Sequence, residues 1–313
     1  MATAFTFPGQ GSQAVGMGKA LAEAFAPARA VFDEVDAALG EKLSAVMWDG
    51  PADKLTLTEN TQPALLAVSL AAIRALEAEA GLDLARDARF VAGHSLGEYS
   101  ALAAAGSLTL SDAAKLVRIR GRAMQRAVPV GKGAMAALLG LEPKAVTEIA
   151  AEAAQGEVCE AANDNAPGQI VVSGAKAAVE RAVEIAKARG ARAMMLPVSA
   201  PFHCALMQPA AEAMRYALGK VKVSPPKVPL VPNVSANPVN DPAQIVNGLV
   251  AQVTGTVRWR ECVIYLVNHG VDRLVEVGSG KVLTGLAKRI AKDATAISIA
   301  TPDDVAAFRV APE

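Results

Sequence analysis

The sequence is poor in cysteine, and this limits both disulfide and metal chemistry. Its three cysteines, Cys159, Cys204 and Cys262, are odd in number, far apart and lack the spacing of metal ligands. No pattern typical of a signal peptide opens the chain. We therefore expect reduced thiols in a cytoplasmic protein that holds no metal.

The chain also lacks an excess of either charge and lacks long apolar runs. Lys and Arg together number 31, as do Asp and Glu, so the formal net charge is zero. A nucleic-acid-binding protein would need a clear basic excess, so nucleic acid is not an expected partner. Apolar runs end well before they reach the length of a membrane span, and we expect a soluble protein without a membrane partner.

What is present is enough apolar material for a large core. The 313 residues are 52% hydrophobic, which allows one large domain or a main domain with a smaller one attached. Strand-like runs at Ala4–Phe7 and Arg89–Ala92 alternate with helical patterns, which favours an α/β fold with a mostly parallel sheet. We expect the first helices at about Gly18–Val35, Pro63–Ala80, Glu98–Ala105 and Ser111–Val128.

A different pattern follows between residues 129 and 198. Two strands, Val158–Ala162 and Gln169–Ser173, are expected on either side of a turn-rich segment, 163–168. With the flanking elements they give the order β-α-β-β-α-β, which is the ferredoxin-like signature. We interpret 129–198 as a small subdomain inserted into a large domain formed by 1–128 and 199–313. After it we expect, among other elements, a strand at Leu230–Val234.

A candidate nucleophile lies at the end of the second strand. Gly93-His94-Ser95-Leu96-Gly97 has the Gly-x-Ser-x-Gly pattern of a nucleophile elbow, with a strand before it and a helix after it. Amide groups at the start of that helix, that of Leu96 first, could stabilise an oxyanion. A simple glycine-flanked turn is the alternative interpretation.

A serine needs a general base, and only three histidines are available. His94 adjoins Ser95 and should point elsewhere, whereas His269 precedes a turn and should be exposed. His203 lies in an apolar loop where the chain returns to the large domain, so it is the favoured base. It could instead be a structural histidine that caps the next helix, and no acidic third member of a triad is evident.

Arg120 is the candidate for binding an anion. On a helical wheel, Lys115, Arg118, Arg122 and Arg126 form a solvated basic face, whereas Arg120 lies opposite among apolar residues. A buried arginine must find an anion, because an unpaired buried charge is costly. That anion could be an internal carboxylate or the carboxylate of a ligand.

Together these residues resemble the malonyl-CoA:acyl carrier protein transacylase family. The matching motifs run in order along nearly the whole chain, and only about the last dozen residues fall outside them. They are Pro8-Gly9-Gln10-Gly11-Ser12-Gln13, Thr61-Gln62-Pro63-Ala64-Leu65, Gly93-His94-Ser95-Leu96-Gly97-Glu98, Arg120, Asn163-x-Asn165-x-Pro167-Gly168-Gln169, Phe202-His203 and Glu276-Val277-Gly278-x-Gly280.

The resemblance implies an α/β-hydrolase-like large domain with a ferredoxin-like insert and a site between them. It implies that Ser95 is acylated and that His203 is the base, oriented by a backbone carbonyl near Gln252. Backbone amides of Gln10 and Leu96 would form the oxyanion hole. The remaining implied substrate contacts are Arg120 for the malonyl carboxylate, with Gln62, His94, Asn163, Asn165 and Gln252.

The implied reaction carries malonyl from malonyl-CoA to the phosphopantetheine thiol of acyl carrier protein through a malonyl-serine. It would supply fatty-acid or polyketide elongation, with no cofactor besides the two substrates and with a monomeric enzyme. A serine hydrolase and a non-catalytic module that holds acyl carriers are the competing hypotheses. The missing triad acid and the position of Arg120 argue against the hydrolase.

Overall fold

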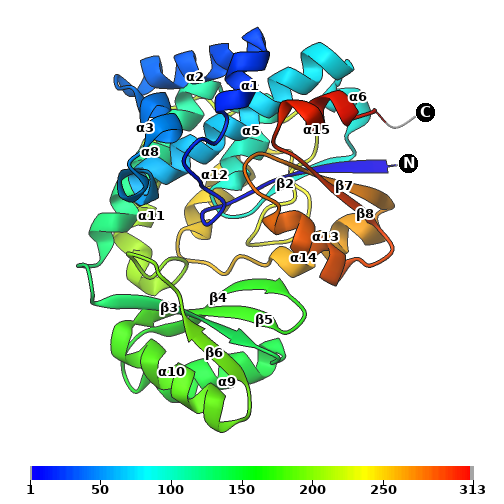
Figure 1. The fold of residues 1–313 in the computed structure, drawn as a ribbon. Coiled ribbons are helices and arrows are strands. Elements are labelled where there is room, and N and C mark those ends of the chain that lie inside the picture. Colours follow the sequence, from blue (N-terminus) through cyan, green and yellow to red (C-terminus); the bar gives the residue numbers. More distant parts are fainter. Residues whose placement is uncertain (1, 311–313) are drawn as a thin grey trace.

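Two sheets that differ in strand direction organise the chain (Figure 1). The computed structural model describes residues 2–310. The first sheet is parallel, in the order β2-β1-β7-β8, with strands β1 (Ala2–Phe7), β2 (Phe90–Gly93), β7 (Val271–Val277) and β8 (Thr295–Ile299). The second is antiparallel, so the predicted α/β class with a mostly parallel main sheet is confirmed.

Helices cover both faces of the parallel sheet. Alternate side chains of a strand point to opposite faces, and β1 follows this rule. Phe5 and Phe7 belong to the core shared with α5 (Thr58–Ala80) and α7 (Gly97–Ala104). Ala4 belongs to the core under α13 (Trp259–Asn268) and α14 (Val282–Ile290).

The other helices of this unit lie around these layers. α8 (Leu110–Ala127) packs on α5, on α2 (Ala26–Leu39) and on α11 (Gln208–Leu218). The shorter or more peripheral ones are α1 (Lys19–Ala24), α3 (Leu43–Asp49), α4 (Ala52–Thr56), α6 (Leu84–Asp87), the 3-10 helix η1 (Ala205–Met207), α12 (Pro242–Gln252) and α15 (Pro302–Ala307). None of the helices within residues 2–310 combines the length and apolar character needed to traverse a bilayer.

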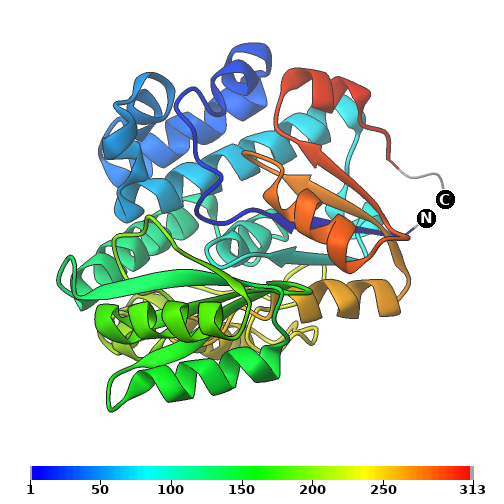
Figure 2. The same cartoon turned by 60° about the horizontal axis from the view of Figure 1, so that its bottom comes forward.

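The antiparallel sheet has the predicted element order β-α-β-β-α-β. Its elements are β3 (Gly133–Leu139), α9 (Pro143–Ala154), β4 (Cys159–Ala166), β5 (Gln169–Ala175), α10 (Lys176–Ala188) and β6 (Arg192–Met195), with strand order β4-β5-β3-β6. Ala136 and Leu138 face α9 and α10, whereas Met135 and Ala137 contribute to the core of the large unit. The sheet therefore lies between its two helices and the rest of the molecule (Figure 2).

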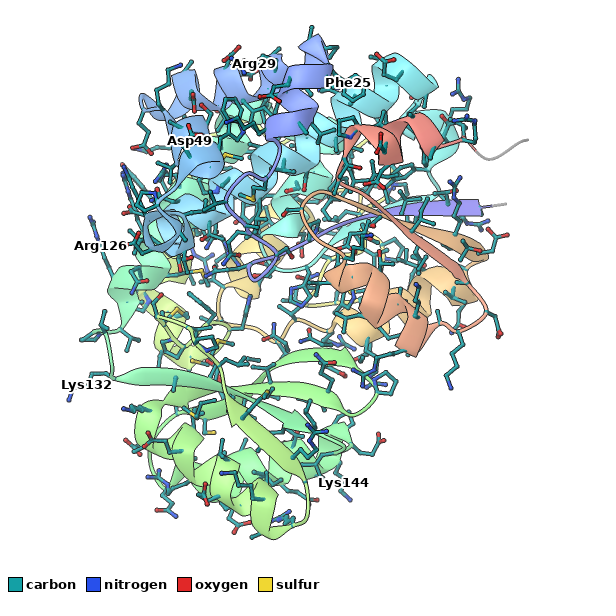
Figure 3. All side chains as sticks on the ribbon, in the orientation of Figure 1. Phe25, Arg29, Asp49, Arg126, Lys132 and Lys144 are labelled. Atoms are coloured by element: carbon teal, nitrogen blue, oxygen red, sulfur yellow. The ribbon has the colours of Figure 1, made fainter. Side chains whose placement is uncertain are left out.

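Three expected elements are wrong in part. The helix at Gly18–Val35 is two helices, because Phe25 between them is extended, with φ −129° and ψ 116° (Figure 3). The helix expected from Ser111 is capped by Thr109, whose side chain accepts a hydrogen bond from the Asp112 amide. At Leu230–Val234 there is no strand, only isolated bridges of Leu230 with Val91 and Val239.

The segment 163–168, expected to be a turn, is mostly strand. β4 continues to Ala166 with two register irregularities, and the turn lies only at Pro167-Gly168. The backbone around Asn163 also pairs with Val257 of the large unit. Arg260 holds Asp164 by two-pronged hydrogen bonds of 2.7–3.0 Å. These contacts join the two units beside the predicted site.

Candidate active site

Ser95 occupies a sharp turn between β2 and α7, as the elbow pattern predicted. Its φ is 53°, a left-handed conformation that is uncommon for a residue other than glycine. Glycine is required on either side of this turn because neighbouring backbone atoms leave no room for a Cβ atom. A Cβ on Gly93 would lie 2.0 Å from the Gly97 carbonyl carbon, and one on Gly97 would lie 2.1 Å from the Phe7 carbonyl oxygen.

His203 is the histidine that reaches Ser95. Its Nε2 lies 2.8 Å from Ser95 Oγ, and its Nδ1 lies 2.9 Å from the backbone carbonyl oxygen of Gln252. Because a carbonyl can only accept, Nδ1 must donate, which leaves Nε2 free to accept the serine proton. His203 too has a left-handed backbone, with φ 58°. The ring is thus fixed in the tautomer of a base.

The surroundings of His203 favour its neutral form. Burial, together with the nearby charge of Arg120, lowers the pKa of the His203 imidazole to about 3. A buried imidazole loses the hydration that would stabilise its charged form, and a neighbouring cation repels the added proton. His203 is therefore unprotonated and able to accept a proton near neutral pH.

Arg120 is buried at 1% exposure and points at Ser95. Its Nη2 lies 3.0 Å from Ser95 Oγ and 2.9 Å from Gln252 Oε1, while its Nη1 lies 2.9 Å from Gln62 Oε1. Within residues 2–310 no carboxylate forms an ion pair with it. Its Nε has no partner there either. Burial lowers the pKa of the Arg120 guanidinium.

A glycine next to Arg120 allows the approach of the two helices that carry these groups. A Cβ on Gly121 would lie 2.6 Å from the carbonyl oxygen of Thr58, at the start of α5. Helix α8 therefore crosses the start of α5 at backbone contact. This crossing brings Arg120 within reach of Gln62, four residues further along α5.

Two backbone amides predicted for an oxyanion hole lie at the elbow. The amides of Ser95, Gly97 and Glu98 donate to Asn233 Oδ1, the His94 carbonyl and the Ser95 carbonyl, respectively. Leu96 lies between these residues, at the N-terminus of α7. Gln10 follows Gly9, where an added Cβ would lie 2.6 Å from the His94 carbonyl oxygen. Both residues thus flank the turn that carries Ser95.

The insert contributes Asn165, but not Asn163, to direct contacts with the elbow. His94 Nε2 lies 2.8 Å from Asn165 Oδ1, and burial lowers the pKa of the His94 imidazole. Asn163 is buried in β4, where its backbone bridges to Val257. In the part of the chain that the structure describes, its side chain makes no hydrogen bond to the other predicted site residues. His269 is exposed and stacks on Tyr265, as expected for a helix end.

One expectation about the basic residues of α8 is wrong. Arg118 is not on a solvated face but is only 5% exposed, and it binds Asn60 and Glu41. The reason is that α5 and the segment after α2 cover this side of α8, so the helix is buried over more than one stripe. Lys115, Arg122 and Arg126 are exposed, and Figure 3 shows Arg126 near the passage from α8 to β3.

Two buried residues that hold the elbow, Asn233 and Glu98, are not among the site residues predicted from the sequence. Asn233 is fully buried and binds both sides of the elbow, through the Gly93 carbonyl and the Ser95 amide. Glu98, 1% exposed, accepts from the Asn233 amide and from Gln252 Nε2. Burial raises the pKa of the Glu98 carboxyl to about 7. The only sequence signal was Glu98 directly after the elbow motif.

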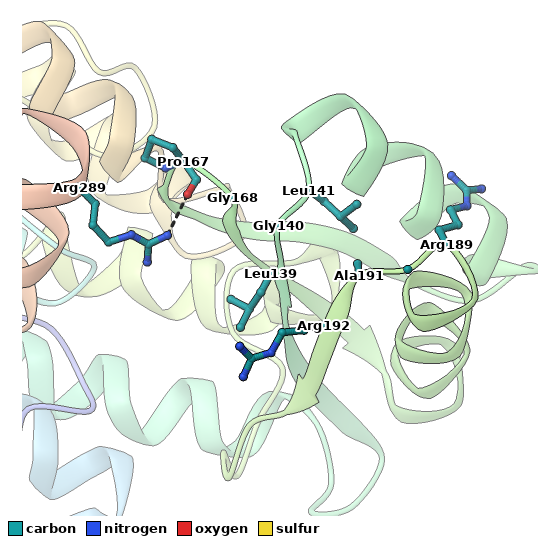
Figure 4. A pocket seen from close by; sticks show the side chains of 10 residues that line it. Leu139, Gly140, Leu141, Pro167, Gly168, Arg189, Ala191, Arg192 and Arg289 are labelled. Carbon is teal, nitrogen blue, oxygen red and sulfur yellow. Dashed lines mark hydrogen bonds between the residues drawn. The ribbon is translucent and has the colours of Figure 1, made fainter.

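A hollow lined by arginines lies at the edge of the insert, away from Ser95. Its volume is about 520 Å³, and Arg189, Arg192 and Arg289 contribute to its wall with Leu139 and Pro167. Figure 4 shows Arg289 of α14 reaching toward the Pro167 carbonyl, with which it forms a 2.9 Å hydrogen bond. Arg192 extends from β6, while Arg189 points away and pairs with Glu148 and Glu152.

No group of three or more His, Cys, Asp and Glu side chains suited to a metal ion occurs within residues 2–310. All three cysteines are buried and free. Cys204 adjoins His203, but burial raises the pKa of its thiol. The chemistry of the site thus rests on a serine, a neutral histidine and a buried arginine.

Comparison with known proteins gives consistent matches over almost the whole chain. A family model described as "Acyl transferase domain" matches residues 4–308. The Escherichia coli malonyl CoA-acyl carrier protein transacylase is 47% identical over 305 residues, which are 97% of each chain.

Solved structures agree with this match. The acyl-carrier-protein S-malonyltransferase of Bartonella henselae has a TM-score of 0.96 at 59% identity, covering 98% of both chains. A malonyl-transacylase in complex with the acyl-carrier protein of a type II polyketide synthase has a TM-score of 0.94 at 42% identity, again covering 98% of both.

Proposed function

The chain belongs to the acyl transferase domain family, and from this membership we propose that it is a malonyltransferase. It transfers the malonyl group of malonyl-CoA to the phosphopantetheine thiol of acyl carrier protein. The product supplies the elongation of fatty-acid chains, with polyketide chains as the alternative. The observation that carries this proposal is the convergence of His203 Nε2 and Arg120 Nη2 on Ser95 Oγ.

In the first half-reaction, Ser95 Oγ attacks the thioester carbon while His203 Nε2 takes its proton. The tetrahedral intermediate carries an oxyanion, which the amides of Gln10 and Leu96 stabilise. The C–S bond then breaks, malonyl remains on Ser95, and the imidazolium returns its proton to the coenzyme A thiolate. The Gln252 carbonyl keeps the ring oriented throughout and replaces the acid of a triad.

In the second half-reaction, the pantetheine thiol of acyl carrier protein attacks the malonyl-serine. His203 accepts the thiol proton and delivers it to Ser95 Oγ as the ester bond breaks, so the enzyme is restored. The thiol must outcompete water for the ester, and exclusion of water from the site would favour it.

Arg120 has the placement of a carboxylate receptor. It is a buried cation beside the nucleophile, and its described hydrogen-bond partners are neutral amides and the Ser95 hydroxyl rather than carboxylates. A malonyl carboxylate would offer the two-pronged ionic pairing that guanidinium prefers. Gln62 and Gln252 hold Arg120 in position, and the His94–Asn165 contact forms the side of the site next to the insert.

The arginine-lined hollow suits the phosphates that both carriers bring. Coenzyme A and phosphopantetheine both bear phosphate groups at the end of the arm remote from the thiol. Arg192 and Arg289 face this hollow from the insert and from the large unit. We place the phosphates here because arginine binds phosphate oxygens well.

The proposal includes the organisation of the chain. We describe 1–128 and 199–313 as an α/β-hydrolase-like domain and 129–198 as a ferredoxin-like insert, supported by the parallel and antiparallel sheets. Residues 1 and 311–313 of this division lie outside the described ones. We further propose a cytoplasmic monomer that uses no cofactor besides its two substrates.

A test against the serine-hydrolase alternative compares products with and without acyl carrier protein. With the carrier protein present, each coenzyme A released should be matched by one malonyl-carrier molecule, measured by mass spectrometry. Without the carrier protein, release of coenzyme A should stop after about one coenzyme A per enzyme molecule. Steady release of free malonate at the same rate in both mixtures would identify a hydrolase.

A further inference from the structure

Both backbone polar groups of Ser95 are held by side chains from distant parts of the chain. Its N–H donates to Asn233 Oδ1 at 2.7 Å, and its C=O accepts from Gln252 Nε2 at 3.0 Å. Ser95 has a left-handed backbone conformation, which is unfavourable for a residue other than glycine and persists only where the surrounding structure holds it in place. These two side chains are part of what determines the conformation.

The side chain of Asn233 connects two backbone groups of the elbow. Its Nδ2 donates to the Gly93 carbonyl at 2.7 Å while its Oδ1 accepts from the Ser95 amide, so it binds the residues on either side of His94. Its side chain is fully buried. An asparagine amide can donate and accept at once, which a carboxylate of the same shape cannot do.

Glu98 holds both Asn233 and Gln252 through one carboxylate oxygen. One oxygen, Oε2, accepts from the backbone amide of Asn233 at 3.0 Å and from Gln252 Nε2 at 2.8 Å. Glu98 lies on the first turn of α7, whereas Asn233 and Gln252 belong to segments more than a hundred residues later. A single buried carboxylate thus joins the elbow to the segments that hold Ser95 and His203.

We infer that Asn233 is a positioning residue for the nucleophile, held in place by Glu98. Its bonds to Gly93 and Ser95 set the backbone from which Ser95 Oγ projects toward His203. This inference rests on the proposed role of Ser95 as the nucleophile. Neither Asn233 nor Glu98 forms a hydrogen bond with the Ser95 hydroxyl or with Arg120. Asn233 acts through the backbone of Ser95, whereas Glu98 acts through Asn233, through the side chain of Gln252 and through its charge, which also acts on Arg120.

The test compares Asn233→Asp with Asn237→Asp. The first change keeps an acceptor for the Ser95 amide but removes the donor to Gly93 and sets a carboxylate oxygen against that carbonyl. Asn237 is on the same loop, is exposed, and forms hydrogen bonds only with Ser235 within the described residues, so it is the matched control. Melting temperature and the folded fraction are measured for both variants.

Two kinetic readouts separate positioning from simple destabilisation. Single-turnover acylation by malonyl-CoA, per folded molecule, should fall about 10- to 100-fold in Asn233→Asp, the scale expected of a small misplacement of a reacting group. The apparent KM and the malonyl-to-acetyl preference should stay within about twofold of wild type, because Asn233 does not touch Arg120. Asn237→Asp should match wild type throughout.

The second readout is the rate at which phenylmethylsulfonyl fluoride modifies Ser95. It depends on the nucleophile and not on malonyl recognition, so it tests the inference even if the assigned substrate is wrong. It should fall with the acylation rate in Asn233→Asp. If phenylmethylsulfonyl fluoride does not modify Ser95 in the wild type, the assignment of Ser95 as the nucleophile is contradicted instead.

An unchanged rate per folded molecule in Asn233→Asp would overturn the inference and leave Asn233 a purely structural residue. If Asn233→Asp does not fold, the inference is tested with Glu98→Gln. It keeps an acceptor, and above pH 7, where the Glu98 carboxyl is ionised, it replaces charge-assisted hydrogen bonds by weaker neutral ones. Both rates should then fall about three- to tenfold, and wild-type values would contradict the inference.

Discussion

At the scale of single residues, we expect selectivity to depend on Arg120, whose described hydrogen-bond partners are amides and a hydroxyl. Malonyl differs from acetyl by one carboxylate, and a buried guanidinium can distinguish the two. Arg120→Ala should therefore lower acylation by malonyl-CoA roughly a hundredfold or more, from a loss of about 3 kcal/mol for an unpaired buried charge. Acylation by acetyl-CoA should be as fast as before or faster.

The measurement is the ratio of the two acylation rates in wild type and variant. Arg120→Lys should restore the malonyl preference poorly, because an ammonium lacks the paired donors of guanidinium. If both rates drop by one factor, Arg120 serves only to hold Gln62 and Gln252, and the malonyl assignment loses its physical basis.

His203 makes a prediction about pH. Its neutral form is the proposed base, and its pKa lies far below the ordinary value of 6.5. In Glu98→Gln, which lacks the carboxyl that titrates near 7, the kcat/KM for acylation should therefore stay level as pH falls through 6.5. Because Arg120 contributes to the lowering, Arg120→Ala should move the acid limb to higher pH, with acetyl-CoA as the substrate. An acid limb at 6.5 or above in Glu98→Gln would contradict this account of the histidine.

The same shift has a consequence for stability. The unfolded chain binds a proton on His203 below about pH 6.5, while the folded protein does not until much lower pH. The free energy of unfolding should therefore decrease as pH falls below 6.5, and His203→Gln should flatten this part of the plot of unfolding free energy against pH.

His203→Ala should slow acylation by about two to four orders of magnitude.

Several site residues could be predicted because each departs from its local pattern. Ser95 lies between two glycines after a strand, Arg120 lies among apolar residues, and His203 lies in an apolar loop. Asn233 could not be predicted, because an asparagine after proline is typical of an ordinary turn. Arg118 was misplaced because a helical wheel describes one helix and cannot include Glu41, which comes from elsewhere in the chain.

At the scale of secondary-structure elements, α8 matters most because it carries Arg120. Its N-cap is Thr109, whose Oγ1 accepts from the Asp112 amide at 3.0 Å. Thr109→Ala should lower the free energy of unfolding by about 1 kcal/mol. Thr147→Ala is the control, since Thr147 bonds only the carbonyl of Pro143 on its own helix and should change stability by less than about 0.5 kcal/mol.

Urea unfolding of the two variants measures this difference directly. Equal losses for both threonines would show that the cap contributes nothing specific. A selective loss for Thr109→Ala, with the malonyl preference intact, would confirm that the helix is stabilised at its start while Arg120 is held by its own partners.

Element types were predictable where the pattern was long, and boundaries depended on tertiary contacts. The β-α-β-β-α-β order followed from alternation and turn residues, but β4 runs through Asn163-Asp164-Asn165 because Arg260 and Val257 supply partners there. The break at Phe25 went unnoticed because the apolar spacing continues across it. β8, at Thr295–Ile299, is short and was not expected.

At the scale of the whole molecule, charge is balanced overall but concentrated locally. Lys281, Lys288, Arg289 and Lys292 are all exposed on or near α14, close to the arginine-lined hollow. The basic residues of α8 are less available to a partner, since Arg118 is buried and Arg122 pairs with Glu59. Acyl carrier proteins are acidic as a family, so we expect the carrier protein to dock at α14.

Salt should therefore slow the second half-reaction more than the first, because exposed charges are screened. Lys288→Glu should raise the KM for carrier protein several-fold without changing acylation by malonyl-CoA. Lys115→Glu, an equal charge change at an exposed position of α8, should leave both half-reactions unchanged. Equal effects of the two variants, or equal salt dependence of the half-reactions, would remove α14 as the docking surface.

The central claim is that Ser95 carries the malonyl group between the two substrates, and intact-mass spectrometry tests it most directly. After mixing with malonyl-CoA and no carrier protein, the wild-type protein should gain the mass of one malonyl group, and digestion should locate it on Ser95. Ser95→Ala should fold normally and gain nothing. An adduct that persists in Ser95→Ala, or a wild-type protein that never gains one, would contradict the account.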